Sequence, residues 1–346
     1  MNITLHRFTV TKRHALTISH GTSAGSENLR VAVEHDGITG LGEMAPTSGG
    51  AVAETAGTAE HDLLQCRDRL EDLAPWEMQQ VEERVREAVG HAAYAALDIA
   101  LHDWLGKRAG APLWRLFGLD LARIPPTSLT IGINPPDVVR HTVTEILART
   151  GALALKVKLG NPAGLEADMA SFAAAQEAAK APVLWRVDAN GGWEPDGALK
   201  MIAWLADRGV EFVEQPLARG REAELPAVHK DSPLPIYADE SIYTFADIPA
   251  LAHCIDGVNL KLMKCGGLRE ALRIIHTARA HGLKVMMGCM SESSLAITAA
   301  AHLSPLADAL DLDSHLNLRD DPFTGAAFEA GRVIPNAGPG LGVQPR

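Results

Sequence analysis

The chain has few cysteines, few aromatic residues and no long hydrophobic run. Its 346 residues include 4 cysteines, none in CxxC spacing, which argues against a disulfide framework or a zinc site and fits a reducing compartment. No stretch of about 18 apolar residues is present to span a membrane. The first residues alternate like a strand and lack the apolar core of a signal peptide. We therefore expect a cytoplasmic protein.

The chain also has no excess of positively charged residues. Lys and Arg total 32 against 43 Asp and Glu, so the net charge is −11. Nucleic acids and anionic membranes reward clustered positive charge, so neither is expected as a partner. Acidic chains are also common among plain soluble enzymes, so the sign of the net charge indicates little more.

Residues 1–118 are predicted to form an α+β domain. Strands are expected at 2–10, 29–35 and 38–44, and EHDG (34–37) is predicted to be the hairpin turn between the last two. A helical block follows, strongest at 81–110.

Residues 119–318 show a regular β/α repeat. Eight parallel strands alternating with helices predict an α/β fold, a closed TIM-type barrel. An open doubly wound sheet is the alternative, but no GxGxxG or GxxxxGK follows the first strand. Residues 319–346, with Gly and Pro punctuation, are expected to return to the first domain. The expected strands are 128–133, 155–159, 184–188, 210–214, 235–239, 258–262, 284–288 and 309–313.

Three acidic residues each end one of these strands. Asp188, Glu214 and Asp239 recur every 25 or 26 residues, which is the length of one strand with its crossover helix. Strand ends of a parallel barrel converge on one mouth. A single acidic strand end could be a helix cap or a solvated charge, but three in register predict a site for a hard cation such as Mg²⁺.

Lysines flank these carboxylates. Lys156 and Lys158 lie two apart on one strand and therefore share a face. Lys261 lies on the sixth strand, across the barrel from the second, although a snorkelling surface lysine is the alternative there. Lys264, three residues on, is out of phase, and we interpret it as a loop residue that is either structural or supports the residues of the site. Mutual repulsion, and any divalent cation nearby, are expected to lower the pKa values of Lys156 and Lys158.

Two lysines on opposite sides of a bound substrate suit one reaction. One removes a proton from a carbon next to a carboxylate, and the other can return a proton to the opposite face. The α-proton is very weakly acidic, so electrostatic stabilisation of the enolate must lower much of the barrier.

Five motifs together resemble the enolase superfamily. They are KVKLG (156–160), VDANGGW (187–193), VEQP (213–216), ADES (238–241) and NLKLMKCGG (259–267). Within that superfamily they are similar to the muconate lactonizing subgroup, and most of all to the dipeptide epimerases. AALDIALHDWLGK (95–107) extends the resemblance into the first domain. It implies a (β/α)₇β barrel with an α+β capping domain, and Mg²⁺ on the three carboxylates. By the same analogy Lys158 and Lys261 are the acid/base catalysts, and Lys156 assists at the substrate carboxylate.

Substrate contacts follow from finer features. Asp311 and Asp313, expected on one face of the eighth strand, resemble the DxD pair with which dipeptide epimerases hold the substrate's α-ammonium group. Cys289, in GCMSESS (288–294), is expected to line the pocket because no base beside it would make it a nucleophile. Thr130 is a further candidate substrate contact.

One loop departs from the family pattern. Epimerases specific for Ala-Glu dipeptides carry an arginine in an early loop, here residues 17–28, where His20 stands instead. Histidine is a poor substitute for a bidentate guanidinium, so Ala-Glu specificity is not expected. Alternatively, His20 has no substrate contact. The loop at 46–52 is expected to be a second, mobile lid.

The leading hypothesis is therefore a Mg²⁺-dependent epimerase that inverts the α-carbon of the C-terminal residue of a dipeptide, its small-molecule substrate. The resemblance also implies a possible homo-oligomer. The alternatives are an N-acylamino acid racemase, an o-succinylbenzoate synthase or a cycloisomerase, whose substrates lack the free ammonium that Asp311 and Asp313 suit. A degenerate barrel without activity is a further alternative, disfavoured because all five core residues are present.

Overall fold

A three-stranded antiparallel sheet begins the chain. The computed structural model describes residues 1–47 and 53–346, and its first strands are β1 (Asn2–Ile18), β2 (Gly21–His35) and β3 (Ile38–Met44). Between β2 and β3, Asp36 and Gly37 have φ of 51° and 72°. Left-handed residues at both turn positions match the twist of a tight hairpin, and the predicted turn at 34–37 is confirmed.

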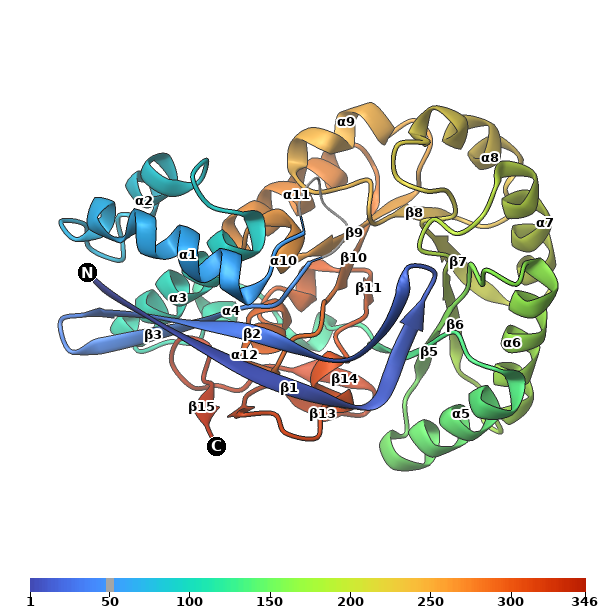
Figure 1. Ribbon diagram of the computed structural model, residues 1–346, viewed down its shortest axis with the longest axis horizontal. Helices are drawn as coiled ribbons and strands as arrows, with labels where there is room; N and C mark the ends of the chain where they lie inside the picture. Colours follow the sequence, from blue (N-terminus) through green and yellow to red (C-terminus); the bar gives the residue numbers. More distant parts are fainter. Residues whose placement is uncertain (48–52) are drawn as a thin grey trace.

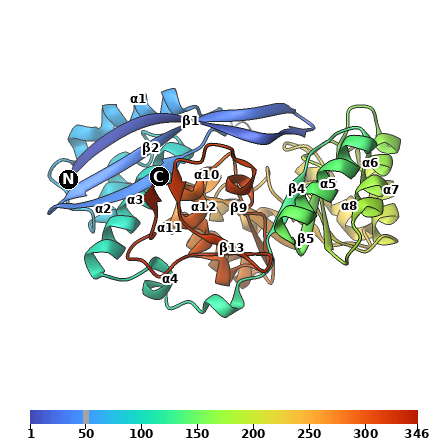
Figure 2. The same ribbon diagram turned by 90° about the horizontal axis from the view of Figure 1, so that it is seen from below.

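The hairpin of β1 and β2 is much longer than expected. Residues 17–28, predicted to be a loop, are mostly strand, with the turn at Ser19 and His20. The two strands pair up to Ile18 and Gly21, and their tip reaches over the barrel (Figures 1 and 2). There the Ser19 hydroxyl donates to the Asn190 carbonyl at 3.0 Å. The first domain therefore places the tip of a β-hairpin beside the barrel mouth.

Helices cover one face of this sheet. The predicted helix over 81–110 is wrong in one respect, because the chain leaves the helix after Val85 and re-enters it at His91. The Glu54 carboxylate accepts hydrogen bonds from the N–H groups of Ala92 and Ala93, so it satisfies donors that begin the second helix. The helices are α1 (Ala56–Cys66), α2 (Met78–Val85), α3 (His91–Ala109) and α4 (Leu113–Leu116).

Eight parallel strands form the barrel. They are hydrogen-bonded in chain order from the first to the eighth, and a parallel bridge between Thr127 and Leu310 closes the ring. Together with the first domain this is the expected α/β barrel with an α+β cap. The strands are β4 (Ser128–Ile131), β5 (Ala154–Lys158), β6 (Leu184–Asp188), β7 (Val210–Glu214), β8 (Ile236–Ala238), β9 (Gly257–Lys261), β10 (Lys284–Gly288) and β11 (Ala309–Leu310).

Helices follow each strand except the eighth, within the residues that the structure describes, as a (β/α)₇β barrel requires. They form the outer ring seen in Figure 1. In the same residues, no helix combines the length and the hydrophobicity needed to cross a membrane. The helices are α5 (Pro136–Thr150), α6 (Leu165–Ala178), α7 (Pro195–Ala206), α8 (Leu225–Asp231), α9 (Ile248–Leu251), α10 (Leu262–Cys265), α11 (Leu268–Ala280) and α12 (Ser294–Ala301).

The barrel strands are buried on both faces. On β5, Leu155 and Val157 are fully buried in the hydrophobic core, while Lys156 and Lys158 alternate with them. Parallel strands normally read as continuous apolar runs for this reason, so inward lysines stand out. The polar interior marks where the chemistry is concentrated.

The eighth strand is shorter than predicted. It ends at Leu310, so Asp311 and Asp313 are not on a strand. The Leu312 N–H instead donates to the Thr127 side-chain oxygen at 2.8 Å, which ends the ladder. Asp313 then precedes the 3₁₀ helix η6 (Ser314–Asn317).

Residues 319–346 contact the first domain. The Arg319 N–H donates to the Thr11 carbonyl at 2.9 Å, and the Leu341 N–H donates to Asp103 Oδ1 at 2.7 Å. These contacts support the proposal that this segment belongs with residues 1–118. Its strands are β12 (Phe323–Thr324), β13 (Ala327–Glu329), β14 (Arg332–Ile334) and β15 (Gln344–Pro345).

Candidate active site

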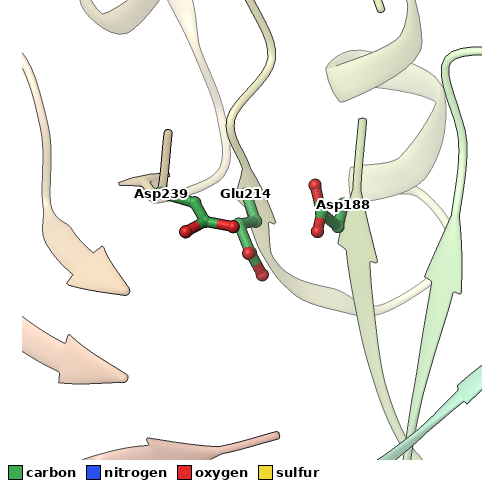
Figure 3. A group of neighbouring side chains, drawn as sticks. All are labelled: Asp188, Glu214 and Asp239. Atoms are coloured by element: carbon green, nitrogen blue, oxygen red, sulfur yellow. The ribbon is translucent and has the colours of Figure 1, made fainter. Parts of the chain in front are cut away.

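Three carboxylates meet at the carboxyl ends of neighbouring strands. Asp188 ends β6, Glu214 ends β7 and Asp239 follows β8, and one oxygen of each lies within 4.8 Å of the others (Figure 3). All three are buried, at no more than 1% exposure. The strand register places Asp188 opposite Glu214, which brings the side chains together without any loop rearrangement.

The electrostatics of this cluster fit a divalent cation. Burial, and then the charge of Asp188, raise the pKa of Glu214 well above its usual range. A carboxyl group that is costly to ionise gains from a cation beside it, and three oxygen donors suit Mg²⁺. The donor set therefore fits the metal that the sequence predicts, with Asp188, Glu214 and Asp239 as the residues that can hold it.

Lysines surround the three carboxylates. Lys158 Nζ donates to Asp188 Oδ2 at 2.5 Å, and Lys261 Nζ donates to Asp239 Oδ2 at 2.6 Å. Burial would raise the pKa of Asp239, but the charges of Lys261 and Lys264 outweigh it and hold that pKa well below its usual range. Asp239 is therefore ionised.

The predicted lowering of the pKa is wrong for Lys156, and the pKa of Lys261 is raised for the same reason. Burial would lower both, but nearby carboxylates reverse the effect: Asp311 and Glu214 act on Lys156, and Asp239 and Glu214 act on Lys261. Both pKa values lie above the usual range for lysine. Attraction to carboxylates exceeds repulsion between lysines because each ammonium contacts an acid directly.

Lys156 lies behind the cavity rather than in it. It is fully buried and pairs with Asp311, with Glu214 at 3.2 Å and with Asp188 at 3.6 Å. Its ammonium thus links the metal-site carboxylates to the Asp311 side.

Asp311 and Asp313 share a partner on the first barrel strand. Thr130 donates from its hydroxyl to Asp311 Oδ1 at 3.3 Å and from its N–H to Asp313 Oδ2 at 2.6 Å. Cys289 Sγ donates to the Asp311 carbonyl at 3.2 Å. Burial raises the pKa of the Cys289 thiol well above its usual range, which fits a lining residue rather than a nucleophile.

The predicted side chains converge on one cavity of about 1220 Å³. It lies between the barrel mouth and the β1–β2 hairpin, and exposed His20 lines it from the hairpin turn. The expected lid at 46–52 falls largely on residues 48–52, outside the described part of the chain. Asp188, Glu214 and Lys156 are fully buried next to the cavity, and the predicted residues that line it are His20, Thr130, Lys158, Asp239, Lys261, Cys289, Asp311 and Asp313.

Lys264 supports the site, as one of its two predicted roles requires, because its ammonium donates to Asp239 Oδ1 at 2.5 Å. Its predicted place in a loop is wrong, since it lies in the short helix α10.

Other residues of the site were not predicted. Asn259 Nδ2 donates to Glu214 Oε1 at 2.7 Å. Asn190 lies two residues after the end of β6 and Gln215 directly after the end of β7, with φ of 41° and 37°. The Asn190 N–H donates to Asp188 Oδ1, and Gln215 Oε1 accepts from the Asp239 N–H. Asn190 and Gln215 follow the acidic strand ends Asp188 and Glu214 by two residues and one residue, and this position in the sequence could have identified them.

Comparison with known proteins agrees with this geometry. Residues 2–118 match the mandelate racemase / muconate lactonizing enzyme N-terminal domain, and residues 138–346 match the enolase C-terminal domain-like family. A hydrophobic dipeptide epimerase from Roseobacter litoralis is 50% identical over 99% of this chain and 98% of its own. An L-Ala-D/L-Glu epimerase from Bacteroides thetaiotaomicron is 37% identical over 99% of this chain and 88% of its own.

A solved structure is also similar throughout. The dipeptide epimerase from Enterococcus faecalis, complexed with Mg and the dipeptide L-Leu-L-Tyr, superposes with a TM-score of 0.91 at 33% identity and covers 99% of this chain and 98% of its own. With both domain families matched and relatives similar along nearly their whole length, the chain belongs to the mandelate racemase / muconate lactonizing enzyme family of the enolase superfamily and, within it, to the dipeptide epimerases, a family of isomerases.

Proposed function

We propose that this protein is a Mg²⁺-dependent epimerase that inverts the α-carbon of the C-terminal residue of a dipeptide. The observation that carries the proposal is the pair Lys158 and Lys261. They end the second and sixth barrel strands, line one cavity and lie on opposite sides of the carboxylate cluster. Inversion needs a proton removed from one face and returned to the other, which two opposed bases can do.

Each residue has a defined task in this proposal. Lys158 and Lys261 exchange a proton with the α-carbon from opposite faces. Asp188, Glu214 and Asp239 hold Mg²⁺, which when bound supplies positive charge near the substrate carboxylate and lowers the cost of removing the α-proton. Lys156, buried behind the cavity, orients Asp311 and adds positive charge near that carboxylate.

The N-terminal end of the substrate would lie beside Asp311 and Asp313. Asp311 and Asp313 would accept hydrogen bonds from the dipeptide's free α-ammonium group, while Thr130 holds both carboxylates in place. N-acylamino acids, cyclohexadiene carboxylates and muconate lack that ammonium and would leave Asp313 without a cation from the substrate. The acid pair therefore favours a dipeptide over the substrates of a racemase, a synthase or a cycloisomerase.

The specificity at the C-terminal side chain follows from what the hairpin offers. His20, rather than an arginine, stands at its turn, and the apolar side chains of Leu16 and Ile18 line the same cavity. A cavity wall of this kind suits an apolar or neutral side chain better than a glutamate.

The test is incubation with Mg²⁺ and pooled L,L-dipeptides in heavy water, read by mass spectrometry. A gain of one mass unit at the C-terminal residue, together with a D-configured product, is expected for a subset of dipeptides. Lys158→Ala and Lys261→Ala should each abolish epimerization, while Lys200→Ala, at an exposed position of α7, should not. No exchange with any dipeptide would overturn the proposal.

Two further expectations belong to this proposal. The four cysteines are free, which supports a cytoplasmic location. A homo-oligomer stays a prediction, and analytical ultracentrifugation would check it.

A further inference from the structure

Lys12 is a buried lysine from the first domain whose place in the site the proposed reaction does not explain. It lies in β1 with an exposure of 8%, while its neighbours Thr11 and Arg13 are exposed. Alternation along a strand puts Lys12 on the face that packs inward. Its side chain lines the same cavity as the proposed catalytic lysines.

The ammonium of Lys12 has unused hydrogen-bonding capacity. Its Nζ donates to Ser23 Oγ at 3.2 Å, across the β1–β2 hairpin. Among the residues that the structure describes, Ser23 is its one hydrogen-bond partner, although an ammonium carries three donors. With an exposure of 8%, little solvent reaches it to complete those bonds. A buried donor that is incompletely paired is costly unless a ligand completes it.

The position of Lys12 identifies which part of a substrate it faces. Its backbone bridges to Leu318, directly after the 3₁₀ helix η6 that Asp313 precedes. Lys12, Cys289 and Asp313 line the same cavity, and Cys289 and Asp313 offset part of the lowering that burial causes in the pKa of Lys12. Lys12 therefore lies at the Asp311–Asp313 end of the cavity, on the side opposite the barrel floor.

We propose that Lys12 is a specificity-determining residue that contacts the side chain of the substrate's N-terminal residue and selects side chains ending in a carboxylate or carbonyl oxygen over those ending in a cation. The inference rests on the proposed function, because Asp311 and Asp313 must hold the α-ammonium group for the N-terminal side chain to lie beside Lys12.

Two physical effects set the direction of this selection. A glutamate or glutamine side chain would accept the free N–H groups of Lys12, whereas a lysine or arginine side chain would bring a second cation against a buried one. Sites built around buried hydrogen-bonding groups discriminate far more strongly than apolar pockets do. Apolar side chains can rest against the methylene stem of Lys12 and are expected to fall between the two extremes.

The experiment compares kcat/KM for four dipeptides that differ only at the N-terminal residue: L-Glu-L-Tyr, L-Gln-L-Tyr, L-Leu-L-Tyr and L-Lys-L-Tyr. The wild-type protein is expected to prefer the glutamate over the lysine dipeptide by about tenfold or more. Lys12→Met keeps the length of the side chain without the charge and should lower that ratio about tenfold or more. Lys12→Arg should keep the preference for glutamate over lysine. Lys180→Met, at an exposed position after α6, is the matched control and should leave the ratio unchanged.

The outcomes separate this inference from the proposed function. If any of the four dipeptides is epimerized but the wild type does not distinguish glutamate from lysine, the inference about Lys12 is wrong and the epimerase stands. The same holds if Lys12→Met lowers kcat/KM equally for all four, which indicates a structural role. If neither these four nor the pooled dipeptides exchange in heavy water, the proposed function fails, and the inference fails with it.

Discussion

Lys158 lies opposite Asp188 in the register of β5 and β6, and its ammonium donates to Asp188 Oδ2 at 2.5 Å. The corresponding contact on the other side of the barrel joins Lys261 to Asp239 at 2.6 Å. Each proposed base is thus held by a different carboxylate of the cluster. In the proposed reaction the two lysines are therefore not interchangeable, because each contacts a different carboxylate.

Single lysine variants should therefore show one-sided exchange. Lys158→Ala and Lys261→Ala should both lose epimerization, with rates reduced by a factor of at least about 100. In each variant, the remaining lysine is expected to exchange the α-proton of only one of the two epimers with solvent. The epimer that still exchanges in Lys158→Ala should be the one that does not exchange in Lys261→Ala. Proton NMR in heavy water with pure L,L- and L,D-dipeptides measures this. Exchange of both epimers by either variant would contradict two opposed bases.

Mg²⁺ should stabilise the folded protein. The three carboxylates are buried within 4.8 Å of one another, and burial with mutual repulsion raises the pKa of Glu214. A cation bound to the folded state at 100 times its dissociation constant adds about 2.7 kcal/mol to the free energy of unfolding. Differential scanning fluorimetry with Mg²⁺ or with a chelator checks this without any substrate. Glu214→Gln should weaken the Mg²⁺ response, and an unchanged melting temperature in the wild type would contradict the assigned site.

Substrate binding should weaken in mild acid through Asp313. Burial, and then the charge of Asp311, raise the pKa of Asp313 to about 6. Since the proposed contact with the substrate's ammonium needs the ionised carboxylate, kcat/KM should rise as pH increases through about 6. The charge of Lys156 opposes this rise in the pKa of Asp313. Asp313→Asn should have a low kcat/KM without this inflection. The same inflection in the variant would assign it to another group.

Stability should also fall in acid through His302. This buried imidazole accepts a hydrogen bond from the Trp114 N–H and donates to the Leu341 carbonyl, both at 3.2 Å. Burial lowers its pKa to about 4. Unfolding releases the imidazole to its ordinary pKa of about 6.5, so the unfolded state binds the proton first as pH falls. Stability from this group is complete above pH 6.5 and is lost between about 6.5 and 4, with about 2 kcal/mol lost by pH 5.

Urea unfolding at pH 7.5 and 5 tests this contribution. Other groups titrate in the same interval, so the comparison is with His302→Gln, which should show about 2 kcal/mol less change between the two pH values than the wild type. An equal change in both proteins would exclude the histidine as the source.

Replacing Glu43 should lower the stability of the protein, because this residue joins the first domain to the barrel by hydrogen bonds. This buried carboxylate at the end of β3 accepts from Asn28 Nδ2 at 2.7 Å and from the Ser293 N–H at 2.9 Å with one oxygen. The other oxygen accepts from the Ser293 hydroxyl and the Ala296 N–H, at the start of α12. Glu43→Gln puts an amide donor among these donors and should cost about 2 to 3 kcal/mol of unfolding free energy. Glu177→Gln, in an exposed ion pair with Arg140, is the control and should change it by less than about 1 kcal/mol.

The sequence by itself determined the barrel and the identity of its inward polar residues. The period of 25 or 26 residues between Asp188, Glu214 and Asp239 equals one β/α unit, and the strand end is where a parallel barrel collects side chains. The length of a strand and the alternation of its side chains depend on consecutive residues, so the sequence alone predicts them. The predicted carboxylates and lysines consequently meet where expected.

Only the tertiary structure decided what depends on contacts between distant segments. Repulsion between Lys156 and Lys158 predicts a lowered pKa, but Lys156 meets carboxylates from other strands, and these raise its pKa. Residues 17–28 are predicted to be a loop, but pairing with β1 extends β2 over the barrel mouth. That same hairpin carries Lys12 to within the influence of Asp313, about 300 residues later in the chain. Charge interactions and strand pairing act through space, so a linear sequence specifies the partners without showing which of them meet.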